Sequence, residues 1–228
     1  KKKLKSWWDI VLIKEELVEL LGRWDDLSRK RPSKPIKDKR TIQDMQEYLK
    51  FHNERDYVLF IIGITTGYRS QDLVDLKIRD IQKALKDKEF CILEKKREKN
   101  HRTRGLKNNP KPRIAVLQPY VAKILKEYIR GKPGYDYAFP SQKGGYITVD
   151  SYGKILRAAG KYFKLDNIAA HTPRKIYAYK LYMDSDKNIE LVRQALGHST
   201  TLITERYLGL DRDAIEEYSK GLNDLVLY

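Results

Sequence analysis

Helical periodicity of the apolar residues constrains this chain more than any other feature. Residues 7–28 place their apolar side chains along one stripe, and residues 57–66 are nearly all apolar up to the break at Gly67. Helical spacing returns in residues 120–129 and in residues 149–163, and it then continues to the end of the chain. The sequence therefore predicts a protein built mainly from α-helices.

The exception to this pattern is residues 89–117. Residues 90–93 and 113–117 have the composition of short strands, and a long polar excursion joins them in the manner of a hairpin. We therefore expect a mainly α fold with a small antiparallel β-sheet, in the α+β class. Cys91, the single cysteine, lies in the first strand. It excludes an internal disulfide and a cysteine-built metal cluster, and we expect it to be a small buried hydrophobe.

Breaks in the pattern predict four segments. Residues 1–30 form an N-terminal helical segment, and prolines among clustered cations make residues 31–40 a basic linker, either a solvated tether or a strap along a phosphate backbone. A capping-box pattern at Thr41–Asp44 begins the main domain, residues 41–210. Residues 211–228 form a tail helix, which either closes its own core or packs into a neighbouring protomer.

The charge balance points to a polyanionic partner. Among 228 residues there are 47 lysines and arginines against 31 acidic residues, which gives a net charge of +16. Such an excess favours nucleic acid, although a lysine-rich proteome is the alternative explanation. No apolar run is long enough to span a bilayer, and the start at Lys1 lacks the features of a signal peptide. We expect a cytoplasmic protein without a membrane partner, and the missing initiator methionine suggests that upstream residues were removed.

The first cluster of chemical interest is His171-Thr172-Pro173-Arg174. Thr172 is the predicted N-cap of a helix, and Pro173 fits its first turn, which also carries Arg174. An arginine beside the free N–H groups of a helix start makes a cradle for phosphate. His171 stands just outside the helix. On its own, a histidine at this position is more often a surface or capping residue.

The second cluster combines a histidine and a tyrosine. Residues 196–199, Leu-Gly-His-Ser, end a helix, so that His198 is fixed at a corner next to a left-handed glycine. Tyr207 follows nine positions later, near the end of the next short helix. The spacing carries more information than the tyrosine, because the chain has 16 tyrosines.

The third cluster is the turn after Gly67. It carries Arg69, and Ser70 to Asp72 are expected to cap a helix that runs through Leu76 and Ile78. Asp72, three residues after Arg69, is a carboxylate that can orient the guanidinium. In most proteins such an arginine makes an ordinary surface salt bridge.

Together and in this order, the three clusters resemble the tyrosine recombinase family, also called the phage integrase family. The family motif Thr-Gly-x-Arg-x-x-Glu places its first arginine at Arg69, with Asp72 where an acidic residue is usual. The motif His-x-x-Arg matches His171 and Arg174. The match implies the family's catalytic-domain fold.

The remaining motifs extend the match over roughly residues 41–210. The family's Leu-Gly-His-Ser falls on residues 196–199, and its nucleophilic tyrosine falls on Tyr207. The family also uses a hairpin lysine, for which Lys95, Lys96 and Lys99 are candidates. We favour Lys96, because the family lysine follows a strand by two or three residues.

The resemblance implies attack on a phosphodiester without a metal or cofactor. Arg69 and Arg174 would hold the nonbridging oxygens, and His198 would donate a further hydrogen bond. His171 would help to take the tyrosine proton, and Lys96 would protonate the departing 5′ oxygen. The product is a 3′-phosphotyrosyl link that can be religated without ATP.

The partner implied is double-stranded DNA, bound by a homotetramer through exchange of C-terminal tails. The context is the cytoplasm of a prokaryotic cell and the integration or excision of a phage, plasmid or other mobile element. Alternatives are a type IB topoisomerase and a catalytically silent DNA-binding protein. Intact members usually carry an upstream DNA-clamping domain, so we expect a catalytic fragment or a naturally short recombinase. The polar excursion would contact DNA through Arg97, Lys99, Arg102, Arg104 and Lys107, with Lys111 nearby.

Overall fold

The computed structural model describes residues 33–104, 111–210 and Ser219. A division between two units of the chain falls after Pro32, and the fold given below is that of the second unit. The helix predicted for residues 7–28 lies outside the described residues, and so does the tail helix predicted for residues 211–228 apart from Ser219, so both stay predictions.

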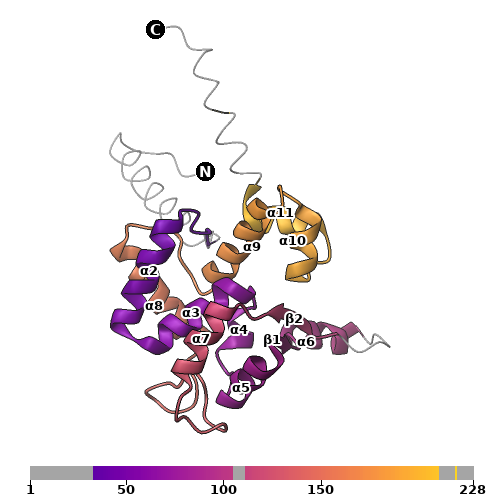
Figure 1. The fold of residues 1–228 in the computed structure, drawn as a ribbon. Helices are drawn as coiled ribbons and strands as arrows, with labels where there is room; N and C mark the ends of the chain where they lie inside the picture. Colours follow the sequence, from indigo (N-terminus) through magenta and orange to yellow (C-terminus); the bar gives the residue numbers. More distant parts are fainter. Residues whose placement is uncertain (1–32, 105–110, 211–218, 220–228) are drawn as a thin grey trace, which may run out of the picture. The chain divides into compact units, whose positions relative to one another are not determined.

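The described part of the chain is mostly helical and contains one two-stranded antiparallel sheet (Figure 1). This architecture confirms the predicted fold class. The elements are α2 Lys39–His52, α3 Glu54–Thr66, α4 Ser70–Leu73, α5 Ile78–Asp87, β1 Glu89–Ile92, α6 Lys95–Arg104, β2 Arg113–Val116, α7 Pro119–Tyr128, α8 Val149–Tyr162, α9 Thr172–Asp184, α10 Ile189–Leu196 and α11 Thr201–Leu208. No helix among the described residues is long and apolar enough to cross a membrane.

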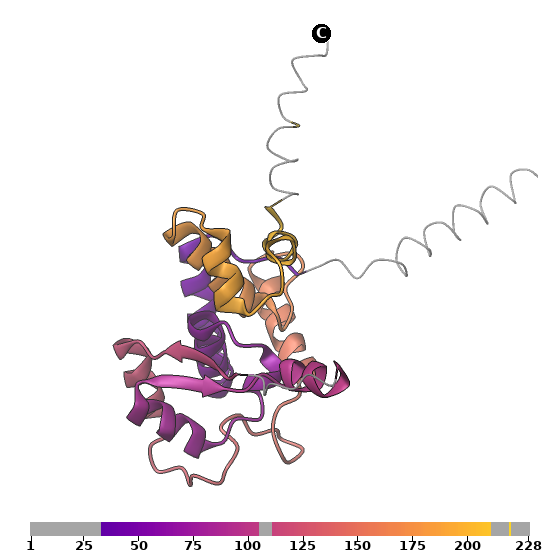
Figure 2. The ribbon, with the colours of Figure 1, turned by 90° about the vertical axis from the view of Figure 1, so that its right-hand side faces the viewer.

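The two strands pair side by side with Phe90 opposite Ala115 and Cys91 opposite Ile114 (Figure 2). Successive residues of a strand point to opposite faces. Phe90 and Ala115 are buried against the helices, whereas Cys91 and Ile114 share the exposed face. The expectation of a buried Cys91 is therefore wrong, because the strand's alternation places the bulkier Phe90 in the core.

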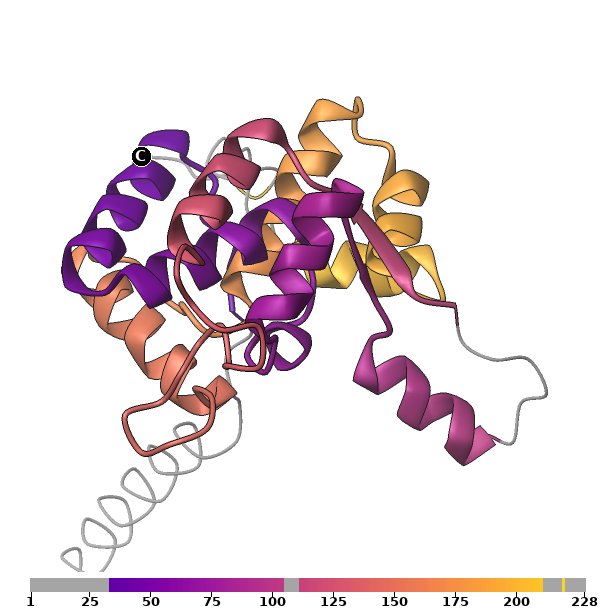
Figure 3. The ribbon, with the colours of Figure 1, turned by 60° about the horizontal axis from the view of Figure 1, so that its bottom comes forward.

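The polar excursion between the strands is partly helical. Residues 95–104 of this segment form α6, which extends away from the strands and the helices around them (Figure 3). Lysine, arginine and glutamate are good helix formers, and the backbone N–H of Glu98 donates to the carbonyl of Glu94 at 3.1 Å to begin the helix. A helix therefore carries Arg97, Lys99, Arg102 and Arg104, which the sequence analysis placed in the connection of a hairpin.

Two helix starts and one helix end differ from the predicted ones. α2 begins earlier than Thr41, because the carboxylate of Asp38 accepts the N–H of Thr41 at 2.7 Å and acts as the N-cap. In α9, Thr172 lies inside the helix, and its hydroxyl accepts from the N–H of Ala169 at 3.0 Å. The helix that begins at Ser70 ends after one turn.

A new helix follows that single turn. The backbone N–H of Lys77 donates to the carboxylate of Asp80 at 2.8 Å, which starts α5 at Ile78. The predicted continuous helix through Leu76 and Ile78 is therefore two helices, α4 and α5.

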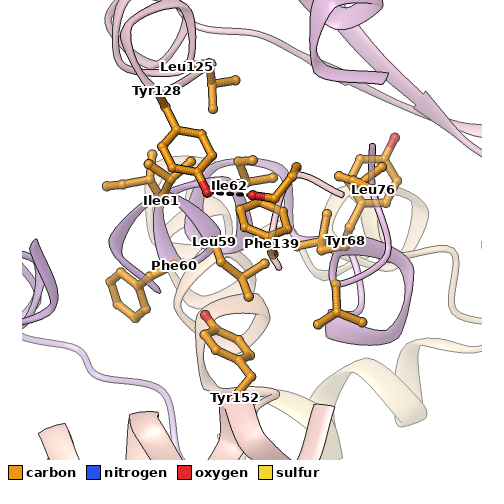
Figure 4. Packing of buried hydrophobic residues seen from close by; sticks show 14 of the residues in the cluster. Leu59, Phe60, Ile61, Ile62, Tyr68, Leu76, Leu125, Tyr128, Phe139 and Tyr152 are labelled. Atoms are coloured by element: carbon orange, nitrogen blue, oxygen red, sulfur yellow. Dashed lines mark hydrogen bonds between the residues drawn. The ribbon is translucent and has the colours of Figure 1, made fainter. Parts of the chain in front are cut away.

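The main apolar core surrounds α3 (Figure 4). This helix contacts α2, α7 and α9, so its side chains are buried on nearly every face, and Leu59, Phe60 and Ile62 have no solvent exposure. The hydroxyl of Tyr128 donates to the carbonyl of Ala138 at 2.5 Å, which satisfies a polar group within this core. The predicted end of α3 at a left-handed glycine is confirmed.

A second and smaller apolar cluster joins α9, α10 and α11. Its buried members are Ala178, Val192, Leu196 and Leu208, and Tyr207 packs against them. α9 links the two clusters, because Ile176 belongs to the larger core and Ala178, on the same helix, to the smaller one.

Candidate active site

The turn that carries Arg69 is rigid because of its neighbours. Gly67 has a φ of 62°, and a Cβ there would lie 2.2 Å from the ring of Tyr177, so only glycine fits. The buried hydroxyl of Tyr68 donates to the carbonyl of Phe90 at 3.0 Å and also to that of Arg113. The turn is thereby tied to both strands of the sheet.

Arg174 lies in the first turn of α9, as predicted, and only 3% of its side chain is exposed. Its Nη1 donates to the carbonyl of Gly67 at 2.5 Å and to Oε1 of Glu94 at 3.0 Å, and its Nη2 donates to the carbonyl of Leu196 at 2.7 Å. The guanidinium therefore joins the Arg69 turn, the hairpin and the end of α10.

Glu94 connects the predicted arginines. Its Oε2 accepts from Nη1 of Arg69, its Oε1 accepts from Arg174, and Nε of Arg113 lies 3.7 Å from Oε1. Burial alone would raise the pKa of the fully buried Glu94, but the nearby charges of Arg174, Arg69 and Arg113 hold it below its ordinary value. A charged carboxylate thus lies among three guanidinium groups.

Asp72 lies near this cluster but contacts a different group. The carboxylate that pairs with Arg69 is Glu94, whereas Oδ1 of Asp72 accepts from the backbone N–H of Lys95 at 2.9 Å. Oδ2 is buried and makes no hydrogen bond to the described residues. Burial raises the pKa of Asp72 above its usual value. Asp72 therefore fixes the residue that follows Glu94, and its supporting role stays a prediction.

Tyr207 and His198 lie side by side, as their spacing suggested. Their ring centroids are 5.2 Å apart, and Nδ1 of His198 is 3.1 Å from the hydroxyl oxygen of Thr204. Burial raises the pKa of Tyr207 to about 12, and the charges of Arg174 and Arg69 oppose this rise. The phenol thus lies within the electrostatic reach of both arginines.

The structure shows fewer contacts for the other predicted catalytic residues, His171 and the hairpin lysines. His171 is exposed at the N-cap of α9, where its carbonyl accepts from the N–H of Lys175 at 3.1 Å. Nζ of Lys95 donates to the carbonyl of Gln71 at 2.9 Å and pairs with Asp75. The side chain of Lys96 lies outside the described residues, so its assignment stays a prediction.

The predicted DNA-binding residues lie on α6 and in the segment that follows it. Lys99 and Arg102 are exposed, and Arg102 makes a loose ion pair with Glu98 at 3.9 Å. The side chains of Arg97 and Arg104 and the whole of Lys107 lie outside the described residues.

Sequence reasoning missed three residues of this site. Glu94 was indicated only by being a carboxylate at the end of a strand, just before a run of cations. Arg113 donates to the carbonyls of Ala195, at 2.6 Å, and of Thr66, and the strand's alternation is the signal that points it inward. The buried Lys175 places its Nζ 4.9 Å from the ring centroid of Tyr207, next to Arg174 in sequence.

Comparison with known proteins places this site in a family. A model of the phage integrase family matches residues 37–213. The probable integrase/recombinase YoeC of Bacillus subtilis is 32% identical over 181 residues, which cover 78% of this chain and 91% of YoeC. Tyrosine recombinase XerC of Vibrio campbellii is 23% identical over 219 residues, and the match covers 91% of this chain but 64% of XerC.

Solved structures share the fold. The XerA recombinase superposes with a TM-score of 0.59 at 19% identity, covering 90% of this chain and 73% of XerA. The XerH recombinase bound to its difH substrate gives a TM-score of 0.56 at 22% identity, covering 83% of this chain and 53% of XerH. The family match spans more than half of the chain and includes all three motif clusters. The chain therefore belongs to the phage integrase family, the tyrosine-type site-specific recombinases.

Proposed function

We propose that this recombinase cleaves and rejoins double-stranded DNA through a covalent bond between Tyr207 and a 3′ phosphate, in the integration or excision of a mobile element. The observation that carries the proposal is that Tyr207 lies close enough to Arg69 and Arg174 for their charges to lower its pKa. The two arginines are themselves held together by Glu94. A nucleophile beside a paired guanidinium site is what phosphoryl transfer to a protein side chain requires.

The arginines would bind the phosphate under attack. Transfer to a phenol passes through a five-coordinate phosphorus whose nonbridging oxygens carry more negative charge than in the ground state. Guanidinium groups fixed beforehand stabilise that charge without reorganising. Arg174 is fixed by two backbone carbonyls as well as by Glu94. Such fixing supports a role in catalysis beyond DNA affinity.

The reaction would need two proton transfers: the attacking oxygen of Tyr207 loses a proton, and the departing 5′ oxygen gains one. Oη of Tyr207 forms a bond to phosphorus as its proton leaves with the help of His171, and the bond from phosphorus to the 5′ oxygen breaks as Lys96 protonates that oxygen. His198 would donate a hydrogen bond to a nonbridging oxygen. The ester formed conserves the bond energy, so a 5′ hydroxyl can reverse the step on another strand.

The exposed cations of α6 support a DNA-binding face. Relatives of known structure are described as complexes with DNA, including XerH with difH and the Tn1549 transposon integrase with circular intermediate DNA. We extend the proposal to duplex binding by α6 and to a homotetramer formed by exchange of residues 211–228. The XerC and YoeC relatives are bacterial, which supports action in a prokaryotic cytoplasm.

The test is a covalent adduct on DNA. Duplexes enriched from a random library by binding to the full chain are nicked to trap the cleaved strand, and the denaturation-resistant adduct is mapped by mass spectrometry. We expect it on Tyr207, and Tyr207→Phe should bind the duplex with nearly unchanged affinity and form none. Tyr162→Phe, which alters an exposed tyrosine on α8, is the control and should react normally. An adduct that persists in Tyr207→Phe would refute the assignment.

Further measurements separate the alternatives. Arg174→Ala should reduce the cleavage rate far more than the affinity; a change in salt dependence alone would make it an ordinary phosphate contact. Efficient relaxation of a plasmid that lacks the selected site would indicate a topoisomerase of type IB. Binding without any adduct in the unaltered protein would favour the catalytically silent DNA-binding protein.

A further inference from the structure

We infer that Glu94 is a positioning residue for the reaction: a buried counter-ion that aligns Arg69 and Arg174 so that their outer N–H groups meet the phosphate. The inference rests on the proposed function, because it assigns a role within the same site. The sequence suggested that Asp72, three residues after Arg69, orients the guanidinium of Arg69; the inference gives this function to Glu94.

The hydrogen bonds define the alignment. Each carboxylate oxygen of Glu94 accepts from a different guanidinium, Oε2 from Nη1 of Arg69 and Oε1 from Nη1 of Arg174. Both bonds are charge-assisted and lie in a buried site, where turning either guanidinium away from the carboxylate would cost free energy. Nε and Nη2 of Arg69 make no hydrogen bond to the described residues, so these donors remain for a phosphate oxygen.

The depths of the three side chains show that Glu94 lies behind the phosphate site. The side chain of Arg69 is 18% exposed, that of Arg174 is 3% exposed and that of Glu94 is fully buried. A phosphate that approaches from solvent therefore meets Arg69 before it reaches Glu94. The carboxylate can remain in place while the phosphate binds, and it does not have to be displaced first.

Electrostatics gives the carboxylate a second effect. Three guanidinium groups, those of Arg69, Arg113 and Arg174, surround the single negative charge of Glu94. After burial, the charge of Arg69 is the main cause that lowers the pKa of Arg174, so the two repel each other. Glu94 offsets this repulsion and leaves a net positive site, suited to a phosphate whose negative charge grows in the transition state.

The backbone around Glu94 joins this alignment to the DNA-binding helix. The carbonyl of Glu94 accepts from the N–H of Glu98 in the first turn of α6. The next N–H, that of Lys95, donates to Oδ1 of Asp72, which is itself buried. Glu94 is thus held from both sides, and a shift of α6 on DNA would be transmitted to the arginine pair.

The experiment compares Glu94→Gln with Glu127→Gln on the duplex that forms the Tyr207 adduct. Both variants lose one negative charge, but Glu127 is an exposed residue of α7 that pairs with Arg130 at 2.7 Å and does not contact the arginine pair. We expect Glu94→Gln to slow single-turnover adduct formation about 100-fold, with duplex affinity within about threefold, because a small misorientation of a reacting group has an effect of that order. Glu127→Gln should change neither quantity by more than about twofold.

The outcomes separate this inference from the proposed function. Unaltered protein that forms no adduct contradicts the proposed function. Normal cleavage by Glu94→Gln contradicts the positioning role, and faster cleavage would show instead that Glu94 competes with phosphate for the arginines. If Glu94→Gln unfolds, Glu94→Asp is the substitute: it keeps the charge but shortens the reach, and it should slow cleavage while remaining folded.

A second measurement needs no DNA. Inorganic sulfate resembles the phosphate group, and the unaltered protein should show a saturable rise in melting temperature with sulfate that Arg69→Ala removes. Glu94→Gln should weaken this sulfate effect at least about threefold. Removing a negative charge would by itself favour sulfate, but we expect the loss of alignment of the two arginines to have the larger effect. Tighter sulfate binding by Glu94→Gln, or no saturable effect in the unaltered protein, would overturn the aligned anion site.

Discussion

The imidazole of His198 stands edge-on to the ring of Tyr207, with centroids 5.2 Å apart and planes inclined at 74°. Each residue is placed by a different helix end: His198 follows the left-handed Gly197 after α10, and Tyr207 precedes the left-handed Gly209 after α11. The contact is therefore determined by two C-caps and by the short connection between them, which explains why the sequence interval between the two residues is informative.

The acidity of Tyr207 gives the first prediction. Because burial raises its pKa to about 12, Tyr207 should titrate at a higher pH in the free protein than an unperturbed tyrosine side chain does. The absorbance change at 295 nm that Tyr207→Phe removes should have its midpoint near that value. An ordinary midpoint near the reference pKa of about 10 would contradict the buried environment.

The same shift has a consequence for stability. The folded pKa lies above the unfolded one, so the contribution of Tyr207 is complete below pH of about 10 and is lost as pH rises through about 12. The free energy of unfolding of the unaltered protein should therefore fall more steeply in this window than that of Tyr207→Phe. Urea unfolding at several pH values measures the difference, with Tyr162→Phe as the exposed control.

The contributions of Glu94 and Asp72 to the free energy of unfolding should change in opposite directions with pH. The lowered pKa of Glu94 means that its stabilisation is present above its unfolded pKa and is lost as pH falls through the lower folded pKa. Glu94→Gln should cost about 3–5 kcal/mol at neutral pH, since it leaves buried arginines unpaired, and less in acid. The raised pKa of Asp72 makes its charge unfavourable in the folded state, so the loss of stability in Asp72→Asn should shrink as pH rises. Equal pH profiles for the two variants would contradict these environments.

Gly67→Ala tests the rigidity of the arginine turn. The left-handed backbone alone costs an alanine about 1–2 kcal/mol, and the clash with the ring of Tyr177 should add about 1–3 kcal/mol. Gly131→Ala is the matched control, because Gly131 has a φ of 73° and no atom within 4 Å of the added Cβ. Chemical denaturation of the two variants should separate the backbone cost from the clash; equal losses would mean that the ring moves aside freely.

The cations of α6 should govern the salt dependence of DNA binding. If Lys99 and Arg102 each contact a phosphate, replacing either with alanine should lower the slope of log affinity against log salt by about one. Arg130→Ala is the control, since Arg130 is an exposed cation at the end of α7, paired with Glu127 as Arg102 is with Glu98. An unchanged slope in both α6 variants would remove the helix from the DNA interface.

Much of this fold was predictable because helix ends and strand alternation are local properties. Gly67 and Gly197 end α3 and α10 as predicted, and the two strands agree with the predicted ones to within a residue. The errors arose where the sequence contained two plausible caps, as with Asp38 and Thr41, and where alternation was not applied to Cys91.

The candidate site was predictable only in part. Arg69, Arg174, His198 and Tyr207 lie in motifs with fixed spacing, and the structure brings them to one region. Glu94 was missed because its role depends on contacts with residues 25 positions before it and 80 positions after it, which no local pattern records. The long side chain of Glu94 reaches both arginines, whereas Asp72 is held by the N–H of Lys95.

The division of the apolar side chains into two clusters has a consequence for motion. Arg69 belongs to the larger cluster's turn, whereas Tyr207 rests on only a few buried side chains shared by α9, α10 and α11. Segments with fewer buried contacts open at lower free energy than the main core. Amide protons of α10 and α11 should therefore exchange with solvent before those of α3, and Tyr207 can change its position while the turn that carries Arg69 keeps its shape.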